Sequence, residues 1–171
     1  MRIFLIGFMG SGKTKRGKKI ATKLGYTFYD LDEIIEKKAN LPLNDIFLTK
    51  GEEKFREIER ESLLEIIRND NFVLSCGGGT PCFFDNMDLM NNSGITIYLK
   101  AGTGFLFSRL VRKQDERPLI MGMKEEELRD YICKTLETRT RFYDKAKLVV
   151  DVLNIKNIVI VEKIRDMENR K

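Results

Sequence analysis

Residues 7–14 read GFMGSGKT, the pattern G-x-x-x-x-G-K-[ST] of a phosphate-binding loop. The pattern follows the apolar run 3–6, where a buried strand would pass into a helix. Glycines let the backbone N–H groups of such a loop approach phosphate oxygens, and the following helix directs its positive end at the same anion. Lys13 is placed to reach the β- and γ-phosphates, and the Thr14 hydroxyl to ligate Mg²⁺. The residues expected to contact the phosphates of a nucleoside triphosphate are Gly10, Ser11, Gly12, Lys13 and Thr14.

Two carboxylates, Asp30 and Asp32, lie at the end of the second predicted strand. Side chains two residues apart on a strand point to the same side of the sheet. In an open parallel sheet, ligands bind at the carboxyl ends of the strands, so both carboxylates are expected to face the cleft beside the phosphate loop. One would hold Mg²⁺ through water and the other would bind the acceptor hydroxyl. The alternative for Asp32 is to cap the helix that follows it.

Two arginines lie on predicted helices, Arg56 near the start of one and Arg139 near the end of another. Each could serve as a guanidinium fork for a substrate carboxylate. The alternative for Arg56 is an exposed ion pair with Glu59, which lies three residues along the helix. The alternative for Arg139 is a cation that interacts with the C-terminus of its own helix. The residues alone leave both questions open.

A glycine run and a charged loop complete the candidate site. Residues 77–79 are three glycines that follow an apolar strand, where exposed backbone N–H groups leave room for a ligand. Residues 112–124 are charged, contain helix breakers and show no core periodicity, which favours a lid. Arg117 in that loop could swing over the phosphates and neutralise charge in the transition state. The alternative for Arg117 is a solvated loop charge.

Composition favours a single globular domain that handles anions. The chain has 171 residues, of which 42% are hydrophobic and 33% charged, as is usual for one domain with its own core. It contains no histidine, which excludes His-based activation and favours phosphoryl transfer, since that chemistry runs on carboxylates, Lys, Arg and metal ions. The formal charge of +5 suits either an enzyme for anionic substrates or a nucleic-acid binder. The scattered basic residues favour the enzyme.

The sequence also carries expectations about location and partners. No apolar stretch approaches the ~20 residues of a membrane span, and the apolar start reads as a buried strand rather than a signal peptide. The three cysteines form no C-x-x-C pair, which argues for reduced thiols in a cytoplasm. We therefore expect a cytoplasmic monomer without a nucleic-acid or membrane partner.

The hydrophobic periodicity predicts an α/β domain with a parallel sheet, because strands and helices alternate along the chain. We find no repeat and no second domain. Strands are predicted over residues 3–6, 27–31, 72–76, 95–99 and 148–152. Helices are predicted over residues 13–24, 32–38, 45–49, 52–68, 102–111 and 125–143, with a last helix capped by Asn154.

Taken together, the motifs resemble those of the shikimate kinase family. The resemblance rests on GFMGSGKT at 7–14, YDLD at 29–32, DIFLTKGEEKFREIE at 45–59, LSCGGG at 74–79, ERPLI at 116–120 and R-x-x-x-Y at 139–143. These motifs occur in the family's order and cover nearly the whole chain. The resemblance implies ATP-dependent phosphorylation of the 3-hydroxyl of shikimate on the way to chorismate and aromatic amino acids. It also implies the three-layer α/β/α fold of nucleoside monophosphate kinases, with a five-stranded parallel sheet of order 2-3-1-4-5.

The resemblance further implies a role for each candidate residue within one kinase domain over residues 1–171. That domain would contain a substrate-binding helical region over about 32–62 and a lid over about 112–124. For catalysis the resemblance implies Lys13, Asp32 and Arg117. It implies that Thr14 and, through water, Asp30 bind Mg²⁺, and that Arg109 lies beside adenine. For shikimate binding it implies Asp32 for the reacting diol, Arg56 and Arg139 for the carboxylate, and Gly78 and Gly79 beside the ring.

Departures from the family pattern concern the nucleotide side. Lys15 and Arg16 stand where the family usually has small or β-branched residues, Asn40 replaces a common glycine, and the adenine-binding stretch near 154–157 is hard to match. Three other functions stay open at this point: another small phosphate-loop kinase, such as a gluconate or nucleotide kinase; a non-catalytic ATP-binding module; and a nucleic-acid binder.

Overall fold

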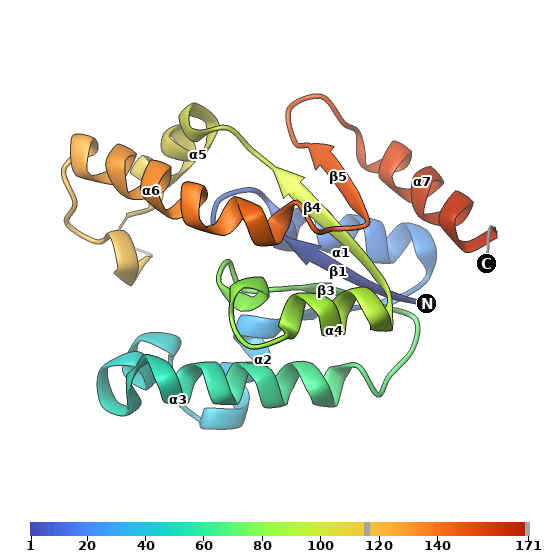
Figure 1. The fold of residues 1–171 in the computed structure, drawn as a ribbon, viewed down its shortest axis with the longest axis horizontal. Helices are drawn as coiled ribbons and strands as arrows, with labels where there is room; N and C mark the ends of the chain where they lie inside the picture. The colour runs from blue at the N-terminus through green and yellow to red at the C-terminus, as the bar shows by residue number, and fades with distance from the viewer. Residues whose placement is uncertain (115–116, 170–171) are drawn as a thin grey trace.

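The computed structural model describes residues 1–114 and 117–169 and contains a sheet of five parallel strands (Figure 1). The strand order is β2-β3-β1-β4-β5, as predicted. The strands are β1 (Arg2–Ile6), β2 (Thr27–Asp30), β3 (Phe72–Ser75), β4 (Ile95–Lys100) and β5 (Leu148–Asp151). The helices are α1 (Lys13–Leu24), α2 (Leu31–Ala39), α3 (Leu43–Ile66), α4 (Asn86–Ser93), α5 (Thr103–Leu110), α6 (Glu125–Tyr143) and α7 (Asn157–Asn169). Short 3₁₀ turns cover Thr80–Cys82, Val111–Lys113 and Pro118–Ile120.

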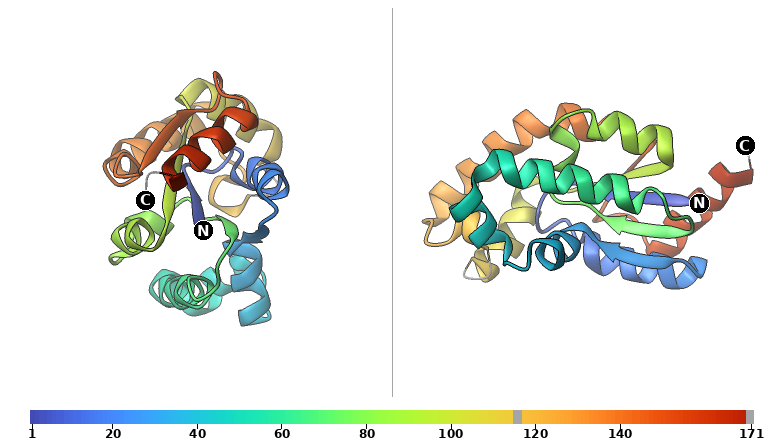
Figure 2. Two further views of the ribbon diagram at one scale, coloured as in Figure 1. Left: turned by 90° about the vertical axis from the view of Figure 1, so that its right-hand side faces the viewer. Right: turned by 90° about the horizontal axis from the view of Figure 1, so that it is seen from below.

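Strand β1 is apolar throughout its buried length because helices cover both faces of the sheet (Figure 2). Ile3 and Leu5 belong to a core cluster that includes residues of α1, α5, α6 and α7. Phe4 and Ile6 point the other way, into a cluster built mainly from α2, α3 and α4. The alternation of side chains along one strand therefore divides the core into two and gives the predicted three layers.

Several chain breaks lie where the sequence places them. Gly25 ends α1 in a left-handed conformation, and Asn40 does the same for α2 with φ of 51°. Gly51 interrupts α3 with non-helical angles (φ 78°, ψ 169°), so the two helices predicted on either side of it are confirmed as two segments joined at a kink.

Two expectations about helices were wrong. Helix α4 was not predicted, because it has only eight residues and shows little periodicity apart from the buried Met87 and Met90. Asn154 does not cap the last helix, which begins at Asn157. Its side chain instead donates to the carboxylate of Asp151, within the turn that follows β5.

The segment predicted as a lid contains more structure than expected. Ile120 is fully buried in the core cluster beside α5 and α6, so one end of the segment is anchored. Asp115 and Glu116, which belong to the predicted lid, lie outside the described residues. Among the residues that the structure describes, no helix is both long and apolar enough to cross a membrane.

Candidate active site

The phosphate loop joins β1 to α1 and requires glycine where its backbone turns. Gly7 has φ of 138°, and a Cβ there would lie 2.8 Å from the carbonyl oxygen of Leu99. Gly12 has φ of 97° and directly precedes α1. The first turn of α1 therefore meets the cavity with its backbone N–H groups unpaired within the helix, which is the arrangement that binds phosphate.

Lys13 is held inside this loop. Its Nζ donates to the carbonyl oxygens of Gly7 (2.8 Å) and Phe8 (3.1 Å). Burial lowers the pKa of Lys13 from 10.5 to about 8, and the nearby carboxylate of Asp32 offsets part of that shift. The ammonium group is therefore poorly solvated and is hydrogen-bonded to neutral carbonyls, which a phosphate oxygen could replace with a stronger, charged partner.

Asp30 and Asp32 lie on different elements, which changes the expected geometry. Strand β2 ends at Asp30, whose carboxylate accepts from the Asp32 backbone N–H (3.2 Å) and caps α2. The alternative that made Asp32 the cap is therefore wrong, since Asp32 lies within the first turn. The Thr14 hydroxyl donates to the second oxygen of Asp30 (2.8 Å). Thr14 and Asp30, both predicted to bind Mg²⁺, are thus hydrogen-bonded to each other.

The Asp32 carboxylate has an unusual electrostatic setting. Burial, followed by the neighbouring charge of Asp30, raises the pKa of Asp32 from 3.8 to about 6. Lys13 acts in the opposite direction but does not cancel the effect. Asp32 is therefore still largely ionised at neutral pH, yet it can accept or release a proton close to that pH.

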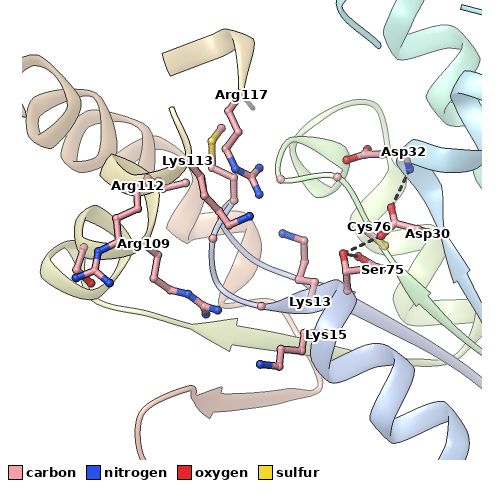
Figure 3. A pocket seen from close by; sticks show the side chains of 18 residues that line it. Lys13, Lys15, Asp30, Asp32, Ser75, Cys76, Arg109, Arg112, Lys113 and Arg117 are labelled. Carbon is pink, nitrogen blue, oxygen red and sulfur yellow. Dashed lines mark hydrogen bonds between the residues drawn. The ribbon is translucent and has the colours of Figure 1, made fainter. Parts of the chain in front are cut away.

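A cavity of about 710 Å³ opens above the phosphate loop (Figure 3). Asp30 and Asp32 lie on one side of Lys13, and Arg109 lies on the other side with its guanidinium directed into the cavity. The basic side chains on the walls are Lys13, Lys15, Arg109, Arg112, Lys113 and Arg117. This excess of positive charge fits a polyphosphate.

A second cavity, of about 650 Å³, combines apolar walls with two arginines. Arg56 and Arg139 both line it together with Asp32, so the three groups that the sequence analysis links do meet around one space. The apolar side chains on its walls include Leu43, Phe47, Leu48, Phe55, Leu119 and Met121. The cavity therefore suits a small ring with an anionic group at one end.

Arg56 is oriented before any ligand binds. Its guanidinium pairs with the Glu59 carboxylate (2.8 Å) and lies over the ring of Phe83, with 3.9 Å from Cζ to the ring centroid. Arg56 is only 8% exposed and Glu59 only 1%, so the alternative of an exposed pair is wrong although the pairing itself forms. Glu59 also accepts from the Thr80 hydroxyl (2.6 Å). Within the described residues the Arg56 Nε has no partner.

The glycine run allows the arginines to approach the backbone. A Cβ on Gly79 would lie 2.7 Å from an Arg56 nitrogen, and one on Gly78 would lie 3.2 Å from Arg139 Nη1. The Tyr143 hydroxyl donates to the Gly78 carbonyl oxygen (2.5 Å) and holds the run in place. The sequence indicated Tyr143 only as part of a motif and Glu59 only as an exposed partner of Arg56, so the part that each plays in ordering the site was not predicted. Their positions one helical turn from Arg139 and Arg56 were the available signal.

The two cavities meet along one wall. Both are lined by Asp32, by Gly77 and Gly78, and by Arg117, with Met9 at the edge. Arg117 points from its loop toward Lys13, and within the described residues its Nε has no hydrogen-bond partner (Figure 3). A phosphate in the first cavity and a hydroxyl in the second would therefore share the space between Asp32 and Arg117.

The oxygen atoms near the phosphate loop fit a magnesium ion. Thr14 and Asp30 supply a hydroxyl and a carboxylate, and the Ser75 hydroxyl lies 3.4 Å from that of Thr14. Within residues 1–114 and 117–169 no group of three or more Asp, Glu, Cys or His side chains could enclose a metal. The donor set therefore suits Mg²⁺, which keeps several waters and binds through one or two protein groups plus phosphate.

Comparison with known proteins points to one family. A family model described as shikimate kinase matches residues 9–168. A shikimate kinase from Phocaeicola vulgatus is 47% identical over 146 residues, which cover 85% of this chain and 83% of that protein. One from Azobacteroides pseudotrichonymphae is 46% identical over 164 residues, which cover 95% of this chain and 96% of that protein.

Solved structures agree with this result. The crystal structure of shikimate kinase from Bacteroides thetaiotaomicron superposes with a TM-score of 0.90 at 39% identity, covering 99% of this chain and 98% of that one. The enzyme from Acinetobacter baumannii, solved in complex with shikimate, gives 0.86 at 29% identity, covering 99% and 93%. A deoxyadenosine kinase from M. mycoides gives 0.58 at 19% identity, which shows a shared fold alone.

Proposed function

Because the chain belongs to the shikimate kinase family, we propose that its two joined cavities bind ATP and shikimate and bring them together at Asp32 and Arg117. The activity is the ATP-dependent phosphorylation of the 3-hydroxyl of shikimate to shikimate 3-phosphate, a step toward chorismate and the aromatic amino acids. The observation that carries the proposal is the shared wall, because it joins a cationic phosphate cavity to a cavity with two arginines.

In the acceptor cavity, Arg56 and Arg139 bind the shikimate carboxylate. Two guanidinium groups in a partly apolar pocket bind a carboxylate strongly and specifically. Glu59 fixes Arg56 in place, so little side-chain entropy is lost when the substrate binds. Gly78 and Gly79 leave space for the ring, and Asp32 accepts hydrogen bonds from the diol at the other end.

In the donor cavity, Gly10, Ser11, Gly12 and Thr14 bind ATP through the phosphate loop. Lys13 exchanges its hydrogen bonds to two loop carbonyls for bonds to phosphate oxygens. Arg109 lies on the side away from Asp32 and contacts the nucleoside end, whereas Arg117 lies at the transferring phosphate. Positioning and charge neutralisation of this kind carry most of phosphoryl-transfer catalysis.

At the shared wall, Lys13, Asp32 and Arg117 act on the transfer itself. Asp32 orients the 3-hydroxyl and takes its proton late, since a loose transition state needs little early proton removal. Arg117 neutralises charge that spreads over the transferring group. Mg²⁺, held by Thr14 and through water by Asp30, would supply further neutralisation of the phosphate charge when bound.

The same proposal covers the organisation of the chain. Residues 1–171 form one kinase domain, in which about 32–62 bind the acceptor and about 112–124 close over the phosphates. Both cavities are built from this one chain, so a monomer suffices for activity. We place the enzyme in the cytoplasm, where ATP is available, and assign it no nucleic-acid or membrane partner.

A coupled ADP-release assay across shikimate, gluconate and nucleoside monophosphates tests the substrate. We expect ADP release with shikimate and Mg²⁺, and essentially none with the other acceptors. Release with gluconate or a nucleotide instead of shikimate would overturn the acceptor assignment. The variant Asp32→Asn distinguishes a general base from a group that only orients the hydroxyl. Near-normal turnover with intact shikimate binding would rule out the base role.

A further inference from the structure

Arg16, two residues after the phosphate-loop motif on the first turns of α1, has no part in the proposed chemistry. Its side chain reaches the segment between β5 and α7. Nη2 donates to the Val152 carbonyl oxygen (2.7 Å), and Nη1 donates to the carbonyl oxygen of Ile155 (3.1 Å) and to Asn157 Oδ1 (2.8 Å). One guanidinium thus holds three points on a short stretch of chain.

The held segment is irregular, and its own hydrogen bonds lie in the turn after β5, where the backbone N–H groups of Leu153 and Asn154 donate to Asp151. Residues 152–154 form a turn, and residues 155 and 156 belong to no helix or strand. Irregular carbonyls that are partly buried need a partner, and the planar fork of arginine can bond several acceptors at fixed spacing. The ammonium group of a lysine could not span the same three acceptors with equal geometry. Arg16 therefore fixes the shape of residues 152–157.

This segment lies at the same edge of the sheet as the phosphate loop, because it follows the carboxyl end of the parallel strand β5 as the loop follows that of β1. The transferring phosphate belongs at the wall shared with the acceptor cavity, so the rest of the nucleotide must leave the cavity past Arg109. Arg109 Nη1 lies over the phosphate loop, 3.4 Å from where a Cβ on Gly12 would sit. Arg109 is also close enough to lower the pKa of Arg16, although burial is the larger cause. A nucleoside that extends past Arg109 along this edge of the sheet would therefore meet the segment that Arg16 holds.

We propose that Arg16 is a positioning residue that builds the nucleoside wall of the ATP site by fixing residues 152–157 against α1. The inference rests on the proposed use of ATP and adds a determinant of base-side affinity that lies outside the phosphate-contacting residues. It also accounts for the departure from small residues at this position, because only a long side chain with several donors can reach the segment.

The test compares ligands with and without a nucleoside. Calorimetry measures the affinity of Arg16→Met for ADP and for inorganic tripolyphosphate, both with Mg²⁺. Loss of several charge-assisted hydrogen bonds should weaken ADP binding about tenfold. Tripolyphosphate affinity should be unchanged. In turnover, KM for ATP should rise while kcat and KM for shikimate stay constant.

Two further variants complete the design. Lys19→Met removes an exposed charge from the same helix and should alter neither ligand. Arg16→Lys keeps the charge but lacks the planar guanidinium, so it should show the same loss of affinity for ADP alone. It replaces Arg16→Met in the test if that variant does not fold. Equal weakening of ADP and tripolyphosphate, or no change in either, would overturn the proposal. A wild-type protein inactive on shikimate would count against the acceptor assignment instead, because these binding measurements do not use shikimate.

Discussion

Replacing Asp32 with asparagine should make the ligand-free protein more stable while it damages catalysis. The reason lies in the pKa of Asp32, which is about 6 in the folded protein and 3.8 as an ordinary carboxyl. The folded state therefore holds a proton on Asp32 more readily than the unfolded chain does. Between pH 4 and 6 the folded state binds more protons, so the free energy of unfolding falls as pH rises through that window.

The magnitude follows from the size of the shift. A raised pKa of about 2 units corresponds to about 3 kcal/mol lost by pH 7, at 1.36 kcal/mol per unit. Asparagine keeps the shape but cannot ionise, so it avoids this loss. Part of the gain disappears because the Asp32 charge also helps to keep Lys13 protonated. We expect Asp32→Asn to be more stable than wild type by about 1–3 kcal/mol at pH 7.

Urea unfolding at pH 4 and pH 7 measures the effect. The advantage of Asp32→Asn should be small at pH 4, where Asp32 is protonated in the folded protein and partly protonated in the unfolded chain, and fully present at pH 7. Asp30→Asn is the matched control, because the Asp30 carboxylate accepts two hydrogen bonds and caps α2. It should bring no stabilisation. If Asp32→Asn gains nothing at pH 7, or gains as much at pH 4, the charge of Asp32 is not the source of the strain.

Two further predictions concern the same site. Gly79→Ala places a Cβ 2.7 Å from an Arg56 nitrogen and should raise KM for shikimate about tenfold or more without changing KM for ATP, whereas Gly104→Ala, with open space around it, should be neutral or slightly stabilising. An unchanged KM for shikimate in Gly79→Ala would show that Arg56 does not bind it. The free-enzyme profile of kcat/KM should be highest between about pH 6, below which Asp32 gains a proton, and about pH 8, above which Lys13 loses one. A profile flat from pH 5 to 9 would contradict both assignments.

The sequence predicted most of the fold because its signals are local and strong. The apolar run of β1 and the glycine loop after it can be read from adjacent residues, and the sheet order follows from the resemblance. Asn40 and Gly51 mark their breaks through backbone preference alone. Helix α4 lacks such signals: it has eight residues, no side-chain cap and only two buried methionines, and its place is set by packing against the sheet.

The site was predictable in its groups but less so in its electrostatics. The resemblance to shikimate kinases implies that Asp32, Arg56 and Arg139 belong together, and the structure places them around one cavity. It does not indicate which aspartate caps α2, because that depends on whether β2 ends at residue 30 or 31. Nor does it indicate that Glu59 is buried, since burial of a helical glutamate depends on what packs over that face of the helix.

The site combines charged groups in a way that favours ligands over the empty state. Lys13 is hydrogen-bonded to carbonyls instead of anions, and Asp32 is ionised despite burial. The terminal nitrogens of Arg56 pair with Glu59 and Glu52, but its Nε is unpartnered within the described residues. Each arrangement costs free energy in the empty protein and is relieved when phosphate, hydroxyl or carboxylate binds. Stability must then come from the two apolar clusters on the faces of the sheet. Substitutions that stabilise the empty protein should accordingly concentrate at the shared wall, where they would weaken the proposed reaction.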